Sequence, residues 1–128
     1  IFKNNLENLL EFINAKNTKV IVITWPTLLS NNMTTDEKIK CFSTMEWCAY
    51  LNEKDFYKLY QEYNEIIREA SNKKNVILLD AADYFARLKD RSDYFLDHKH
   101  LLDKGNNYLA GLIADKMELE GIIHNYSR

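Results

Sequence analysis

Glycine and proline are scarce in this sequence, which has three Gly and one Pro among its 128 residues. This scarcity leaves no room for a Gly-rich phosphate-binding loop, a flexible linker or a low-complexity segment. The apolar runs are also short, about the length of a strand, whereas a membrane span requires roughly 20 residues. We therefore expect neither a loop of that kind nor a transmembrane helix.

An excess of charge of one sign is absent as well. The chain has 17 Lys and Arg against 19 Asp and Glu, a formal net charge of -2, and the two signs are interspersed. Without a basic surface, nucleic acid and anionic membranes are not expected partners. The hydrophobic content of 46% is sufficient for the core of a single domain over residues 1–128.

Only two cysteines occur, Cys41 and Cys48, seven residues apart in an expected helix. That separation of two turns argues against a disulfide between them. Both lie in an apolar helical pattern, which favours burial as small hydrophobic residues over a role as thiol nucleophile. The chain begins with Ile and shows no secretory pattern. We therefore expect it to be part of a longer protein.

Two short apolar runs predict strands buried on both faces, Val20–Ile23 and Val76–Leu79. Pro26 and Asp80 end these strands. Amphipathic periodicity predicts helices around them. The helical patterns lie within residues 4–17, 34–51, 55–75, 81–88 and 103–117. Thr34 and Glu37 have the spacing of a capping box, and Asp103 is the expected N-cap of the last helix.

Strands that alternate with helices pair in parallel through right-handed crossovers, which predicts a three-layer α/β arrangement. Two strands make a small sheet, because stable sheets usually contain several more. We therefore expect partner strands upstream or on another chain. If the chain stands alone, the strand at residues 20–24 should present an unpaired edge.

Asp97 and His100, three residues apart ahead of the last helix, are the candidate catalytic pair. A carboxylate on one ring nitrogen holds a histidine in a single tautomer, so that the other nitrogen can take a proton. The alternative is a polar loop that caps the last helix. A carboxylate within about 3 Å of His100 Nδ1 favours catalysis, and side chains that point apart favour capping.

His98 completes the sequence DHKH and could suggest a metal site with Asp97 and His100. No third or fourth ligand stands at a recognisable spacing, so we predict no metal and no cofactor. His98 is expected to face solvent, as is His124 near the C-terminus.

The stretch DHKHLLDKGNNYLAGLIADKM resembles the last sequence block of the SGNH hydrolases, also called GDSL esterases and lipases. That block reads Asp, two residues, His, and then a helix with a Gly five residues after the His. The matching residues are Asp97, His100 and Gly105, with Ala110 and Ile113 along the helix. The preceding order of helices and strands is similar to the second half of that fold, so the resemblance covers nearly the whole chain.

The resemblance implies the last two strands of a flavodoxin-like sheet and hydrolysis of a small ester or acyl substrate. It assigns His100 as general base and acid and Asp97 as its orienting carboxylate. In the family the nucleophilic Ser comes from an N-terminal GDS block, and the oxyanion donors come from other blocks. No serine here stands in a GDS or G-x-S-x-G setting. The five are Ser30, Ser43, Ser71, Ser92 and Ser127.

We therefore predict that the isolated chain is inactive, and that an N-terminal half or a second chain completes the sheet. Two alternatives stay open, an acyltransferase with the same apparatus and a non-catalytic α/β module that binds proteins. Trp25 and Pro26, after the first strand, either line the substrate side or only end the strand. Tyr57, Tyr60 and Tyr63 indicate amphipathic packing, because base-stacking surfaces carry interleaved basic residues.

Overall fold

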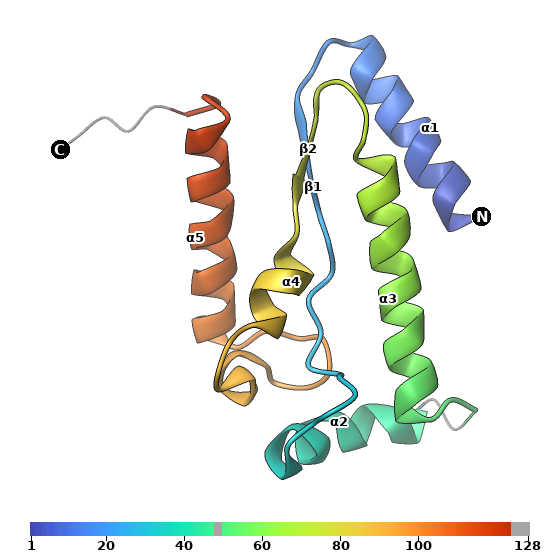
Figure 1. The fold of residues 1–128 in the computed structure, drawn as a ribbon, viewed down its shortest axis with the longest axis vertical. Helices are drawn as coiled ribbons and strands as arrows, with labels where there is room; N and C mark the ends of the chain where they lie inside the picture. The colour runs from blue at the N-terminus through green and yellow to red at the C-terminus, as the bar shows by residue number, and fades with distance from the viewer. Residues whose placement is uncertain (48–49, 124–128) are drawn as a thin grey trace, which may run out of the picture.

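The computed structural model describes residues 1–47 and 50–123, without the side chains of 43–47. These residues form a mixed α/β structure of five α-helices, a short 3-10 helix and a parallel sheet of two strands (Figure 1). The elements are α1 Phe2–Ala15, β1 Val20–Ile23, α2 Thr35–Trp47, α3 Glu53–Ala70, β2 Val76–Leu79, α4 Ala81–Ala86, η1 Arg91–Tyr94 and α5 Asp103–Leu119.

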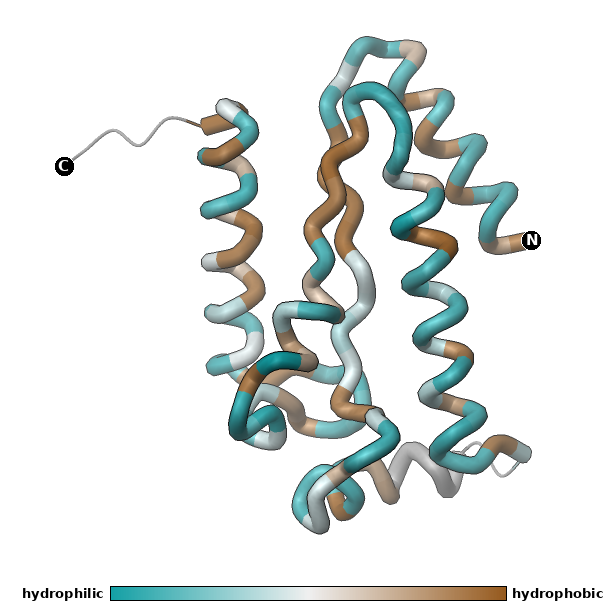
Figure 2. Tube along the Cα trace, viewed as in Figure 1, coloured by the Kyte–Doolittle hydropathy of each residue, from teal (hydrophilic) through white to brown (hydrophobic). Residues whose placement is uncertain are grey.

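The two strands have the bounds that the apolar runs predict, and they pair in parallel. Val20 lies opposite Val76, and the register continues to Ile23 opposite Leu79. Helix α5 flanks the strands on one side, while α1 and α3 flank them on the other (Figure 1). Hydrophobic residues are concentrated along the two strands (Figure 2). The α/β prediction and the parallel pairing are therefore confirmed.

One cluster of buried hydrophobic residues lies beyond the carboxyl ends of the strands. Its fully covered residues come from the segment after β1, from α2, from α4 and from the loop before α5: Leu28, Leu29, Cys41, Ala81, Phe85 and Phe95. The Phe85 ring makes edge contacts with the rings of Phe95 and Tyr108 at centroid distances of 5.4 and 5.2 Å. This cluster joins the end of the sheet to the loop that carries Asp97 and His100.

The capping box at the start of α2 is confirmed. The Thr34 backbone N–H donates to Glu37 Oε2 at 2.8 Å, and the Glu37 N–H donates to Thr34 Oγ1 at 3.3 Å. The prediction for α5 is wrong, because Asp103 is the first helical residue. Leu102 is the N-cap and supplies no side-chain bond. The first turn of α5 packs closely against η1, with the Gly105 backbone beside the Tyr94 carbonyl oxygen.

Burial explains the properties of Cys41. The residue is completely covered, and desolvation raises the pKa of its thiol to about 12. A thiol with that pKa is not a nucleophile at neutral pH, as the apolar pattern predicts. Cys48, His124 and Ser127 lie outside the described residues.

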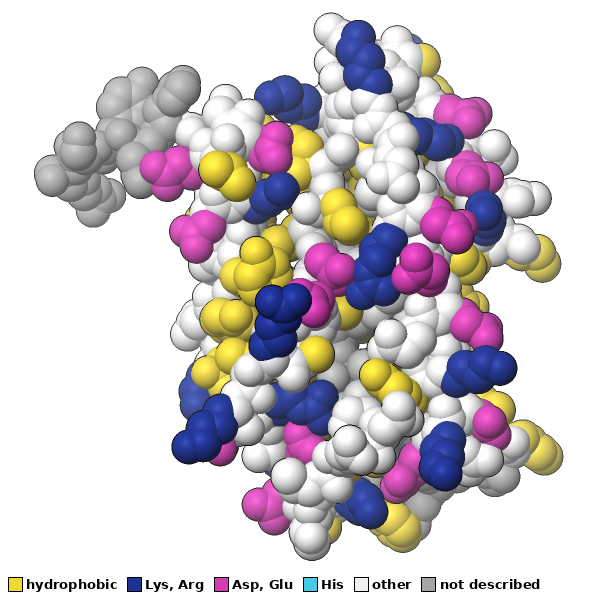
Figure 3. All heavy atoms as spheres, in the orientation of Figure 1, with side chains coloured by type: hydrophobic (Ala, Val, Ile, Leu, Met, Phe, Trp, Pro, Cys, Tyr) yellow, Lys and Arg dark blue, Asp and Glu magenta, His cyan; other side chains and the backbone are white. Residues whose placement is uncertain are grey.

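Charged side chains of both signs are interspersed over the face shown in Figure 3, as the composition indicates. Among the described helices, none is long and apolar enough to cross a membrane.

Candidate active site

A short loop between η1 and α5 carries Asp97, His98 and His100. Phe95 and Leu101 close the loop through an isolated antiparallel bridge. Inside the bridge, the Leu96 N–H donates to the His100 carbonyl oxygen at 2.7 Å. The backbone conformation of the loop is therefore set by its own hydrogen bonds.

The segment that follows β1 anchors this loop to the sheet. The carbonyl oxygen of His98 accepts two hydrogen bonds, from the Leu28 N–H at 2.9 Å and from Thr27 Oγ1 at 2.7 Å. Lys40 of α2 donates to the Phe95 carbonyl oxygen at 2.8 Å. Two distant parts of the sequence, the segment after β1 and helix α2, thus hold the loop in place. The local sequence pattern does not indicate these contacts.

Asp97 and His100 are brought together by this loop. Asp97 Oδ2 lies 2.6 Å from His100 Nδ1, while Asp97 Oδ1 accepts the backbone N–H groups of Lys99 and His100, both at 2.9 Å. Partial burial raises the pKa of Asp97, but the hydrogen bonds from His100 and from the two amides outweigh it and lower the pKa to about 2. The carboxylate is therefore ionised at neutral pH and places the proton on Nδ1.

The second ring nitrogen of His100 remains open. The His100 side chain is 62% exposed, against 21% for Asp97. Within the described part of the chain, no group bonds to Nε2. Neither side chain bonds to the backbone of α5, so the interpretation of the pair as a helix cap is wrong. The arrangement holds one tautomer and leaves Nε2 free to accept a proton.

His98 is buried, so the prediction that it faces solvent is wrong. Only 4% of the residue is exposed, and its ring contacts the edges of Phe56 and Tyr60 at centroid distances of 5.7 and 6.0 Å. Desolvation lowers the pKa of His98, although the charge of Asp97 opposes that shift. The apolar side of α3 covers this ring because the loop folds back onto it, an arrangement without a signature in the local sequence.

Trp25 and Pro26 occupy different environments. The Trp25 residue is 52% exposed, and its ring meets that of Tyr60 at a centroid distance of 5.8 Å, whereas Pro26 is buried. Tyr60 contacts both Trp25 and His98, so one ring separates Trp25 from the loop that carries Asp97 and His100. Sequence reasoning missed Asn64, a fully buried residue that bonds to the Trp25 backbone. The sequence does offer one sign of this role, because Asn64 is a polar residue on the otherwise apolar stripe of α3 that includes Tyr60 and Ile67.

A nucleophile for His100 is not found among the serines whose side chains are described. Ser30 accepts a bond from Arg91, Ser71 donates to the Ile67 carbonyl, and neither these nor Ser92 bonds to His100. Across the described residues, there is also no group of three or more His, Cys, Asp and Glu that could hold a metal ion.

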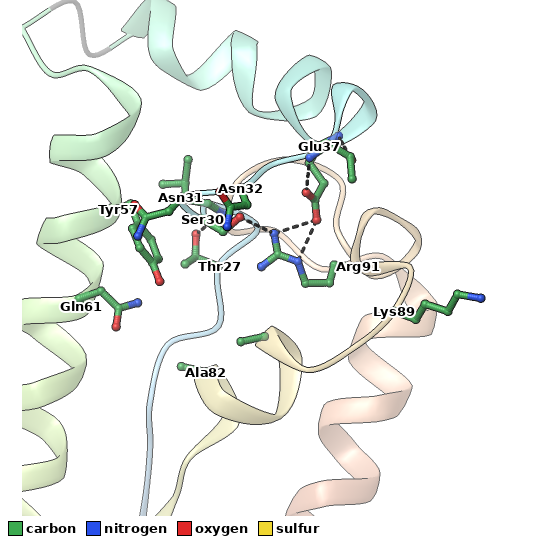
Figure 4. A pocket seen from close by; sticks show the side chains of 13 residues that line it. Thr27, Ser30, Asn31, Asn32, Glu37, Tyr57, Gln61, Ala82, Lys89 and Arg91 are labelled. Carbon is green, nitrogen blue, oxygen red and sulfur yellow. Dashed lines mark hydrogen bonds and ion pairs between the residues drawn. The ribbon is translucent and has the colours of Figure 1, made fainter.

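A cavity of about 470 Å³ lies between α3, α4 and the segment after β1 (Figure 4). Neither Asp97 nor His100 lines it. Thr27 lines the cavity and donates to the His98 carbonyl, so this residue lies between the cavity and the loop that carries Asp97 and His100. No family model matches this chain, and no curated protein or solved structure matches it either.

Proposed function

We propose that this chain carries the general base and its orienting carboxylate of a serine ester hydrolase of the SGNH type. The supporting observation is the distance of 2.6 Å between Asp97 Oδ2 and His100 Nδ1, together with the exposure of His100. The ring of His100 faces solvent on its free side, where a reactant can reach it. That exposure suits a group that exchanges protons with a reactant.

In this reaction, His100 Nε2 takes the proton from a serine hydroxyl as its oxygen attacks the acyl carbon of an ester. Asp97 stabilises the resulting imidazolium and keeps the ring oriented. The imidazolium then returns the proton to the departing alcohol, and water repeats the cycle on the acyl-enzyme to release the acid. The serine and the oxyanion donors belong to residues outside this sequence. An acyltransferase would use an alcohol or amine where the hydrolase uses water.

The same proposal includes a larger, flavodoxin-like sheet in which another strand lies beside β1. All four residues of β1 are apolar but only half-buried, and neither strand has a second neighbour within the described residues. The N–H groups of Val20 and Thr24 bond to the β2 side. Because successive amides alternate in direction, those of Ile21 and Ile23 point to the open edge.

Hydrogen exchange tests this strand edge. In the isolated chain, the Ile21 and Ile23 amides should exchange much faster than those of Val22 and Thr24. They should become protected when the N-terminal half of the protein or a second chain is present. Equal protection of all four amides in a monomer of the isolated chain would contradict the proposed sheet.

Hydrolysis of p-nitrophenyl acetate by the protein that contains this chain tests the catalytic proposal. His100→Ala should lower kcat by roughly 10²- to 10⁴-fold, because general acid–base catalysis contributes about that much. Lys99→Ala, on the neighbouring residue, should leave kcat within about twofold. Turnover by the isolated chain that depends on one of its own serines would refute the placement of the nucleophile elsewhere.

A non-catalytic α/β module is the second candidate, and the half-buried apolar strand β1 favours it as a surface for another protein. The kinetic experiment separates the two functions. If His100→Ala leaves esterase activity unchanged while the β1 amides become protected in a complex, the chain is an interaction module.

A further inference from the structure

The cavity between α3, α4 and residues 27–34 contains no uncompensated charge. Arg91 lies in its wall, but the guanidinium is paired with Glu37 at 2.7 Å, and the two side chains are only 11% and 6% exposed. The same guanidinium donates to the Leu28 carbonyl oxygen at 2.8 Å and to Ser30 Oγ at 3.1 Å. Its charge is therefore satisfied inside the protein and is not available to an anion.

Lys89 is the other cationic residue of the lining, and its side chain extends away from the cavity (Figure 4). An anionic ligand would thus meet the Glu37 carboxylate without a free cation to balance it. A cationic ligand would face Arg91. The electrostatics of the cavity favour a neutral molecule.

Neutral hydrogen-bonding side chains line much of the remaining surface. Tyr57 and Gln61 project from α3, and Asn31 and Asn32 lie on the segment after β1 (Figure 4). In the described part of the chain, these four side chains make no hydrogen bond to protein groups. A purely apolar ligand would cover such donors and acceptors without satisfying them, at a cost of about 1–3 kcal/mol each.

The opposite wall provides a small apolar surface, the methyl group of Ala82 on α4 (Figure 4). A ring that presents C–H groups on its face and hydroxyl groups on its rim matches this combination. The volume of about 470 Å³ lies within the roughly 300–1,000 Å³ of small-molecule sites.

We infer that this cavity is a binding site for an uncharged saccharide of one or two sugar rings. The site lies apart from Asp97 and His100 and does not depend on the proposed hydrolase activity. Gln61 and Asn32 would bond to ring hydroxyl groups, and the Tyr57 hydroxyl would take part from the same side as Gln61. Ala82 would contact the apolar face of the ring.

Titrations of the 128-residue chain followed by amide NMR test this site. Glucose, N-acetylglucosamine and maltose are the neutral probes, glucose 6-phosphate is the anionic probe and benzyl alcohol is the apolar probe. At least one neutral saccharide should shift the amides of residues 27–34 and 57–61 in a saturable way, and more strongly than the other two probes. Preference for the anionic or the apolar probe, or no shift with any neutral saccharide, overturns the inference.

Three variants locate the binding. Gln61→Ala with Tyr57→Phe should raise the Kd of the bound saccharide by about tenfold or more, which corresponds to about 1.4 kcal/mol. Asn32→Ala should also raise the Kd, because Asn32 lines the cavity from the segment after β1, on another wall than α3. Lys89→Ala is the matched control and should leave the Kd unchanged. Unaltered affinity in the Gln61 and Asn32 variants, with spectra that show the native fold, also overturns the inference.

Discussion

Asn64 of α3 holds both polar groups of the Trp25 backbone. Its Oδ1 accepts the Trp25 N–H at 2.7 Å, and its Nδ2 donates to the Trp25 carbonyl oxygen at 3.0 Å. Trp25 lies two residues beyond the end of β1. The buried Asn64 amide therefore supplies hydrogen bonds to the backbone just where those between the two strands end. It also ties α3 to the segment whose Thr27 and Leu28 bond to the loop that carries Asp97 and His100.

Asn64→Leu should therefore destabilise the fold by about 2 kcal/mol or more, because two backbone groups lose their partner at a buried position. Urea unfolding measures the loss. Gln61→Leu, on an exposed position of the same helix, should change the free energy of unfolding by less than about 0.5 kcal/mol. Similar values for the two variants would contradict the role of Asn64.

Gly105→Ala and Gly111→Ala should have opposite effects, although both residues lie in α5. Alanine normally stabilises a helix relative to glycine by up to about 1 kcal/mol, and nothing lies within 4 Å of a Cβ at position 111. At position 105 a Cβ would overlap the Tyr94 carbonyl oxygen and touch Leu101. We expect a higher melting temperature for Gly111→Ala and a lower one for Gly105→Ala.

Glu37→Gln should cost about 3 kcal/mol, because it leaves the Arg91 guanidinium charged and poorly compensated in a covered position. Glutamine keeps an oxygen for the Thr34 N–H, so the capping box survives and the loss reports the ion pair. Asp36→Asn on the same turn removes an exposed charge and should cost less than about 1 kcal/mol. Denaturation of the two variants at neutral pH makes the comparison, and a smaller loss for Glu37→Gln would be contrary to expectation.

The lowered pKa of Asp97 predicts that the folded chain loses stability in acid. Its pKa is about 2 in the folded chain, below its ordinary value of 3.8, so the unfolded chain is protonated first as pH falls. The stability from this carboxylate is complete above about pH 4 and is lost as pH falls through about 2. Asp97→Asn should reduce the slope of unfolding free energy in that range. If the NMR titration of the Asp97 carboxyl carbon gave a pKa near the ordinary 3.8, the hydrogen-bonded geometry would be contradicted.

The buried His98 ring predicts a second loss of stability on acidification, at a higher pH than that of Asp97. Because burial lowers the pKa of the folded imidazole below 6.5, the unfolded chain takes up the proton first as the solution becomes acidic. Stability from the neutral ring is complete above about pH 6.5 and is lost below it. The free energy of unfolding should be lower at about pH 5 than at about pH 8, and His98→Leu should make this difference smaller. An identical slope in the variant would exclude His98 as its source.

The strands and most helix positions could be predicted from local pattern. Val20–Ile23 and Val76–Leu79 are apolar runs bounded by residues that end strands, and both strands have those bounds in the structure. The capping box at Thr34 was also predictable, because its two partners are three residues apart. The error at Asp103 arose from the loop before it, where the bridge between Phe95 and Leu101 determines how α5 begins.

By itself the sequence determined the order of helices and strands and selected Asp97 and His100, since periodicity and a spacing of three residues are local properties. Only the tertiary structure decided that these two side chains meet, that His98 is covered by α3, and that Asn64 holds the Trp25 backbone. The contacts of His98 with α3 and of Asn64 with Trp25 join segments tens of residues apart. They follow from how the loops close over the end of the sheet, which depends on packing among all the elements.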